Sequence, residues 1–300
     1  MTSFRKGTLY LLIASVIFGF NGFFSKYSYS YGMNPVMLVA VRSVFSIVAL
    51  FLVLLFRRER IVPVLRRSQW ITVIIISLLY AATMTLFLAS FVYMDSGLCV
   101  SVQFCFPALI LIMGALFFRD KVVPSDLFCF FLCFAGIVLL ILPGHVSLTG
   151  ILIAFLSGLC FAWYSLLLEK CRVFSYISKL SLSLIINIIT FIVILPIAAA
   201  TGNLTLALPF PAYLHGCILA LNSSVIAAIL YQTGVNLINA KYASLLVTVE
   251  LVVAIVVGIV VFHESVMPLT ITGSVCILLS AVFLVLFKEN FHFTKHHLRH

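Results

Sequence analysis

Residues 106–124 (FPALILIMGALFFRDKVVP) and residues 250–268 (ELVVAIVVGIVVFHESVMP) decide how this chain folds. They belong to a longer match, in which 96–140 aligns without a gap on 240–284 at an offset of 144 residues. The equivalent positions include Gly114 and Gly258, Phe118 and Phe262, Asp120 and Glu264, and Pro124 and Pro268. Self-similarity at a fixed offset indicates a repeated structural unit. The chain is therefore built from two related halves.

The composition indicates whether these halves lie in water or in a lipid bilayer. Of 300 residues, 64% are hydrophobic and only 9% are charged, and the mean hydropathy is +1.28. An ordinary soluble domain is about 45–50% apolar and about 25% charged. A soluble enzyme, a disordered chain and a short disulfide-stapled module are therefore excluded. The chain is expected to be an all-α membrane protein, because backbone polar groups in lipid must be satisfied within each helix.

Hydropathy and helix-breaking residues predict ten transmembrane helices joined by short loops. The expected spans are 7–28, 35–56, 70–92, 97–118, 125–142, 149–169, 180–200, 213–234, 242–262 and 267–287. With the N-terminus inside, every one of the 18 basic residues except Lys26 and Arg42 falls on the inner side. Lys and Arg mark cytoplasmic loops, so both termini are predicted to be cytoplasmic.

Ten spans divide into two halves of five. We expect a first repeat over 1–145, a second repeat over 146–290 and a cytoplasmic tail over 291–300. Because five is odd, the two halves enter the membrane in opposite directions. Inverted repeats of this kind are typical of secondary transporters, whose solute site lies between the halves near the middle of the bilayer.

The repeat also resembles a known family, the EamA-type ten-helix transporters of the drug/metabolite transporter superfamily. The resemblance is carried by motif residues in both halves: Asn21, Lys26, Arg42, Pro107, Gly114, Asp120, Pro124, Glu250, Gly258, Glu264 and Gly273. Two positions depart from the family pattern, since Leu251 stands where proline is usual and Asp120 where glutamate is commoner. Both departures bear on helix kinks and helix ends.

The resemblance implies a carrier of small organic solutes, most often an exporter of amino acids, amines or other metabolites. Proton coupling is one driving force that the family uses. An importer with the same fold is an alternative, and so is a membrane enzyme or a scaffold acting on lipid-linked substrates. The enzyme lacks support in the sequence, because no carboxylate cluster or His–Glu metal motif is present. We therefore expect no catalytic residues, no metal and no cofactor.

Three charged side chains fall within predicted spans, where charges are costly and mark functional sites. Glu250 has two possible roles. It either binds a proton or a cation, or it forms a hydrogen bond that holds two helices together. Arg42 either contacts solute or forms a fixed structural pair, and Lys26 either contacts solute or extends to the headgroups. Asp120 and Glu264 stand at span ends, where they are expected to pair or to cap helices.

Uncharged polar residues also gather near the middle of the spans. The predicted solute-contacting set is Asn21, Tyr80, Gln103, Trp163, Tyr164, Asn222 and Ser223. Such groups could orient a small solute in an apolar cavity. They could equally serve as hydrogen bonds between helices.

The expected partners are a small-molecule solute and the lipid bilayer, with no nucleic acid; the oligomeric state is left open. The net charge of +10 is explained by the loop lysines and arginines rather than by nucleic acid. The eight cysteines lie mostly in apolar runs and are interpreted as packing residues. Arg5 and Lys6 precede a run long enough to span, which favours a retained first helix over a signal peptide. The expected location is a plasma membrane, the bacterial inner membrane.

Overall fold

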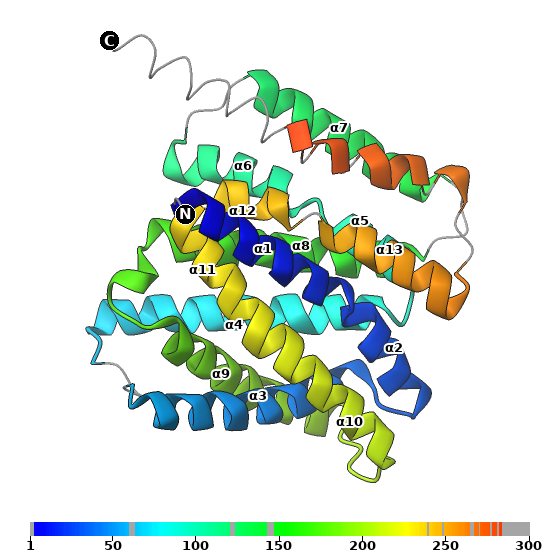
Figure 1. The fold of residues 1–300 in the computed structure, drawn as a ribbon. Coiled ribbons are helices and arrows are strands. Elements are labelled where there is room, and N and C mark those ends of the chain that lie inside the picture. The colour runs from blue at the N-terminus through cyan, green and yellow to red at the C-terminus, as the bar shows by residue number, and fades with distance from the viewer. Residues whose placement is uncertain are drawn as a thin grey trace, which may run out of the picture.

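The computed structural model is a bundle of helices (Figure 1). It describes residues 3–59, 64–120, 124–142, 147–238, 240–247, 249–264, 267–269, 271–276, 278–280 and 282–283. These residues form helices, turns and short connections, and none of them forms a strand. The prediction of an all-helical chain is therefore confirmed for the described part. The expected tail over 291–300 lies outside the described residues.

The helices of the first half follow the predicted spans closely. They are α1 (Ser3–Gly19), α2 (Asn21–Ser30), α3 (Pro35–Arg57), α4 (Arg67–Ser90), α5 (Ser96–Gln103), α6 (Phe106–Phe118) and α7 (Pro124–Ile141). The α3 N-terminus is set by Asn34, whose side chain accepts a hydrogen bond from the Met37 N–H, and by Pro35 at the first helical position.

The second half repeats this order. Its elements are α8 (Leu148–Lys170), the short 3₁₀ turn η1 (Val173–Ser175), α9 (Lys179–Ala200), α10 (Phe210–Leu219), the π-helix η2 (Ala220–Ala227), α11 (Ala228–Ile238), α12 (Ala240–Leu246) and α13 (Val249–Phe262). Ser147 and Ser178 cap α8 and α9, because each side-chain hydroxyl accepts a hydrogen bond from the backbone N–H three residues later.

Seven helical stretches are long and apolar enough to cross a membrane: Phe4–Ser30, Pro35–Arg57, Arg67–Ser90, Ser96–Phe118, Leu148–Ser175, Lys179–Ala200 and Phe210–Ile238. Three shorter apolar helices, Leu127–Gly136, Val249–Phe262 and Ile271–Ser280, fall in the remaining three predicted ranges. Large apolar side chains such as Leu55, Phe56 and Phe131 are exposed on the outside of the bundle. An apolar exterior is suited to lipid.

The two halves interlock rather than stand apart. Helix α4 of the first half packs along α8 and α9 of the second, α3 packs along α9, and α1 packs along α11 and α13. Figure 1 shows α3 and α9 at one edge of the bundle and α7 at the opposite edge. The core therefore lies between helices of different halves.

Three predicted spans are interrupted in the structure. The first breaks at Phe20 between α1 and α2, the fourth breaks at Phe104 and Cys105, and the ninth breaks after Leu246. The eighth keeps its course but widens into η2. Continuous helices were predicted at all four places, because hydropathy measures apolarity and does not register a local loss of backbone pairing.

Candidate functional site

A line of polar side chains crosses from the first half to the second. It begins at Arg42 on α3, whose guanidinium is 2% exposed and donates through Nη2 to the Tyr80 hydroxyl on α4 at 3.2 Å. Tyr80 packs against Tyr164 on α8, with ring centroids 5.4 Å apart. The expected residues Arg42, Tyr80 and Tyr164 are therefore brought together.

The line continues through residues of the second half. Gln232 on α11 donates through Nε2 to the Tyr164 hydroxyl at 3.4 Å and to Ser183 Oγ on α9 at 3.1 Å. Beside it, the Ser165 and Tyr231 hydroxyls share a hydrogen bond of 2.7 Å. Five helices thus contribute to one buried polar line.

Several polar atoms of the described residues are buried without a hydrogen-bond partner among those residues. They are Asn21 Oδ1, Ser28 Oγ, Arg42 Nη1, Ser223 Oγ and Ser224 Oγ. They come from α2, α3 and η2, and each of these elements packs against the others or against α10 between them. Buried polar atoms are normally paired, so unpaired ones indicate a ligand or water site.

The π-helix explains why two of these hydroxyls are free. In the regular helices, many buried serines and threonines donate to the carbonyl four residues earlier, as Ser43, Ser46 and Ser77 do. In a π-helix the backbone pairs over five residues instead, so the geometry for that bond is lost. Ser223 and Ser224 lie in η2, and π-helical segments are frequent at functional sites.

The interrupted helices place two further predicted residues. Gln103 ends α5 and donates to Ser157 Oγ on α8 at 3.0 Å, which in turn donates to the Thr83 carbonyl. Glu250 lies in the first turn of α13, is 6% exposed, and forms no ion pair with any residue that the structure describes. Gly19 packs against the Val253 side chain and the Glu250 carbonyl, so the α1–α2 break lies against this part of α13.

Other predicted residues lie elsewhere. Trp163 is less buried than Tyr164 and packs on Phe117, with ring centroids 4.9 Å apart. Asn222 is partly buried in η2. Lys26 lies near the end of α2, in an ion pair with Glu264 at 2.6 Å, and Asp120 pairs with Lys170 at 2.7 Å. The expectation that the two acids pair is therefore confirmed, and these pairs lie apart from the polar line.

The repeat motif residues shape the helix ends. Arg119 and His263 adopt the left-handed conformation, with φ of 55° and 51°, at equivalent positions. The following N–H groups, of Asp120 and Glu264, donate to the Gly114 and Gly258 carbonyls. Pro107 begins α6 as its second residue. Both acidic side chains therefore fold back over a glycine of the preceding helix.

The family comparison agrees with this geometry. A model of the EamA-like transporter family matches the chain twice, over residues 5–142 and 148–286. The chain belongs to the EamA-like transporter family. As an EamA protein of the drug/metabolite transporter superfamily, it is a multi-pass membrane protein of a transporter family.

Structural comparison supports the fold of this EamA protein. A solved structure titled "Crystal structure of protein" superposes with a TM-score of 0.69 at 15% identity and covers 96% of this chain and 99% of its own. The search of curated proteins found no match.

Sequence reasoning missed several members of these clusters. Ser183 and Ser165 carry no charge and no motif, so nothing in the sequence distinguishes them from packing serines. Lys170 is different, since it stands 144 residues after Lys26, the same offset that relates Asp120 to Glu264. The repeat could therefore have predicted the second ion pair.

Proposed function

We propose that this EamA protein is a secondary carrier that exports small organic metabolites across a bacterial plasma membrane by alternating access. In this proposal ten helices span the bilayer, both termini are cytoplasmic, and the repeats over 1–145 and 146–290 rock against each other. Amino acids and amines are the first solute classes to test. The solute site is the buried polar line and the unpaired atoms beside it.

The observation that carries the proposal is the state of Arg42. Its guanidinium is buried, donates to one neutral hydroxyl, and leaves Nη1 without a partner among the described residues. No carboxylate of the described residues forms an ion pair with the Arg42 guanidinium. An unpaired buried charge is costly unless a counter-ion arrives. A solute carboxylate would supply that charge, with a planar fork suited to guanidinium.

The neutral acceptors suit the other end of such a solute. Asn21 Oδ1 and the hydroxyls of Ser223 and Ser224 are unpaired and can accept hydrogen bonds from an ammonium group. Tyr80, Tyr164 and Tyr231 provide an aromatic wall for an apolar side chain. The predicted solute is therefore zwitterionic rather than purely cationic.

Glu250 is proposed as the proton-coupling group. Its carboxyl is buried in the first turn of α13, at a helix interruption of the kind that secondary transporters use to build ion sites. Protonation removes the cost of a buried charge, so proton binding would be linked to the conformation that exposes this turn.

The first experiment is flux in proteoliposomes. A pooled amino-acid and amine mixture is measured by mass spectrometry for uptake and efflux, with and without an inward proton gradient. Depletion or accumulation of a member establishes transport, its direction and its coupling. If no member moves under any gradient, export of amino acids or amines is refuted.

Two variants sharpen this result. Arg42→Gln should weaken transport of an amino acid about tenfold or more and spare the amine that lacks its carboxylate. Arg57→Gln is the matched control, because it removes the same charge from an exposed position on the same helix. Equal loss of both solutes in Arg42→Gln would contradict carboxylate recognition.

The coupling role is tested separately. Glu250→Gln should abolish uphill, pH-dependent flux while solute-dependent thermal stabilisation persists, with Glu59→Gln as an exposed control. Unchanged uphill transport in Glu250→Gln would remove the proton role from this residue.

A further inference from the structure

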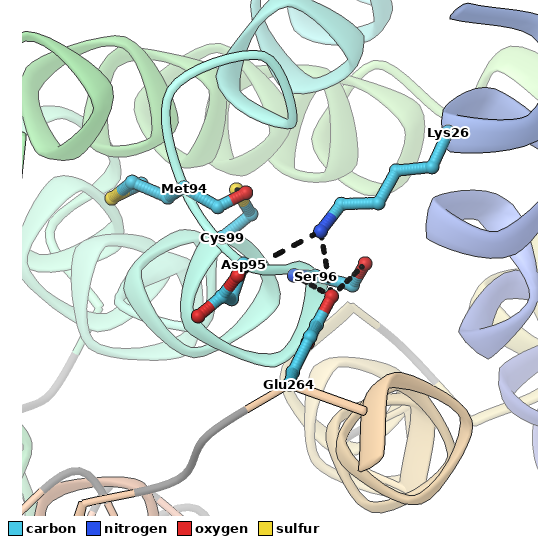
Figure 2. Close-up of polar contacts among 6 residues, drawn as sticks. All are labelled: Lys26, Met94, Asp95, Ser96, Cys99 and Glu264. Carbon is cyan, nitrogen blue, oxygen red and sulfur yellow. Dashed lines mark hydrogen bonds and ion pairs between the residues drawn. The ribbon is translucent and has the colours of Figure 1, made fainter. Parts of the chain in front are cut away.

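The Lys26 cluster, formed by Lys26, Asp95, Ser96 and Glu264, joins residues of the two halves by polar contacts (Figure 2). Glu264 Oε1 accepts hydrogen bonds from Lys26 Nζ at 2.6 Å and from the backbone N–H and hydroxyl of Ser96 at 3.1 Å each. Asp95 lies 3.9 Å from the same ammonium, and the Phe262 ring lies beneath it at 5.4 Å.

The Lys170 cluster, formed by Lys170, Asp120, Glu169 and Ala240, has the same construction. Lys170 Nζ lies 2.7 Å from Asp120 Oδ1 and 3.8 Å from Glu169, and it stands 5.8 Å from the Phe118 ring. The Ala240 N–H donates to Glu169 Oε2 at 2.9 Å. Each cluster therefore holds one lysine between two carboxylates, over a phenylalanine, at the start of a helix.

The internal repeat relates the two clusters residue by residue. The gapless match at an offset of 144 places Ser96 on Ala240, Phe118 on Phe262 and Asp120 on Glu264, and Lys170 stands the same 144 residues after Lys26. In each cluster the lysine lies in the last two turns of the first span of one half, and the carboxylate nearest to it follows the fourth span of the other half. Each ion pair therefore fastens one repeat to the other.

The clusters lie at opposite ends of the bundle. Helices α5 and α6 begin at Ser96, in the Lys26 cluster, and end at Phe118, beside the Lys170 cluster. That stretch of 23 residues is about 35 Å long. Helices α12 and α13 run the opposite way, from Ala240 to Phe262, and Figure 1 shows the two pairs alongside each other.

The two ends differ in solvent access. In the Lys26 cluster the lysine and Glu264 side chains are 19% and 7% exposed, whereas Lys170 and Asp120 are 25% and 45% exposed. A pocket of about 360 Å³ adjoins the Lys170 cluster, lined by Glu169, Arg172 and Asn236 among others. The Lys26–Glu264 pair is therefore more buried than the Lys170–Asp120 pair, while Asp95 at the edge of the Lys26 cluster is 56% exposed.

We propose that the ion pairs Lys26–Glu264 and Lys170–Asp120 are a pair of latches, one at each mouth of the carrier, that open alternately. Each latch separates when the first helix of one repeat moves away from the fourth helix of the other. By the predicted topology the Lys26 latch faces outside and the Lys170 latch faces the cytoplasm. The inference rests on the proposed carrier function, to which it adds the groups that close each mouth.

The test compares Glu264→Gln with Asp120→Asn by hydrogen–deuterium exchange and mass spectrometry on the full chain in detergent micelles. Glu264→Gln should raise exchange roughly fivefold in peptides covering residues 24–32 and 94–100 and lower it in peptides covering 166–175 and 240–247. Asp120→Asn should give the opposite pattern. Glu59→Gln, which breaks an exposed pair with Arg57, should change neither end.

The reciprocal change at the distant end distinguishes a latch from a local structural contact. Increased exchange confined to the mutated end, or no change at either end, would overturn the proposal. Increased hydrogen–deuterium exchange throughout the chain would indicate unfolding. In that case the double variant Lys26→Glu with Glu264→Lys, which swaps the two charges, decides whether the ion pair acts as a latch. Restored protection supports the latch, and persistent loss of protection contradicts it.

Failure of the latch and failure of the carrier function remain distinct. The exchange experiment needs no solute, so reciprocal opening without any flux would support the latches and count against the proposed solutes. Flux without reciprocal opening would support the carrier and overturn the latches.

Discussion

The difference in burial between the two ion pairs predicts a difference in their energies. We consider two double-mutant cycles, one with Lys26→Met and Glu264→Gln and the other with Lys170→Met and Asp120→Asn. Both cycles remove the same kind of contact, at N–O distances of 2.6 and 2.7 Å. A difference between the two coupling energies therefore reflects the surroundings of each ion pair and not its N–O distance.

The magnitudes follow from exposure. At 2.6 Å and an effective dielectric constant of about 20, the attraction between Lys26 and Glu264 is about 6 kcal/mol before desolvation. Desolvation of each ion offsets most of this, and a hydrogen bond to a charged group retains a net of about 1.5–3 kcal/mol. Asp120 is 45% exposed, so its pair with Lys170 should retain only about 0.2–1 kcal/mol.

The assay is reversible unfolding in mixed micelles, followed by circular dichroism, for each wild type, single and double variant. The coupling energy is obtained from the four free energies of unfolding in each cycle. We expect the Lys26–Glu264 coupling to exceed the Lys170–Asp120 coupling at least twofold. Equal couplings, or a larger value for the Lys170–Asp120 pair, would refute the inference that Lys26–Glu264 is the more strongly desolvated of the two pairs.

Three further predictions follow from the same contacts. Gly258→Ala should displace the Glu264 side chain, which folds over this glycine, and should reproduce the exchange pattern of Glu264→Gln. Tyr80→Phe should cost about 1–3 kcal/mol of unfolding free energy, because Arg42 loses its one hydrogen bond to a side chain of the described residues. Burial and the Glu264 carboxylate raise the pKa of Asp95, while Lys26 lowers it. The ionised form is thus disfavoured, so thermal unfolding should show wild type losing stability relative to Asp95→Asn as the pH rises above about 4.

The sequence predicts the helix ends well, because charged residues and helix caps there have strong local preferences. Asn34, Ser147 and Ser178 each begin a helix where a side-chain acceptor is needed. That Asp120 and Glu264 each form an ion pair was likewise predictable, since a carboxylate near lipid requires a partner.

The interior was less predictable. Leu251 stands where Pro107 stands in the first half, yet α12 and α13 are interrupted as α5 and α6 are. Proline alone therefore does not explain the second break. Hydropathy also gives no side-chain direction. Trp163 and Tyr164 are adjacent in the sequence, so hydropathy alone could not predict that they lie in different surroundings.

Helix α13 connects the proposed proton site at Glu250 to the Lys26 cluster. Glu250 lies in its first turn, and Glu264 stands two residues after its last residue, Phe262. The 14 residues from Val249 to Phe262 form a helix about 21 Å long. A helix transmits displacement along its length because its backbone hydrogen bonds resist local bending. Any tilt of α13 that exposes the Glu250 carboxyl would therefore also move Glu264 relative to Lys26. A proton bound at Glu250 could in this way favour one state of the latch at the far end of the same helix. Uncoupling the two would require a flexible point inside α13, so glycine substitution at the exposed Val256 should weaken the effect of pH on exchange at the Lys26 cluster without touching either charged group.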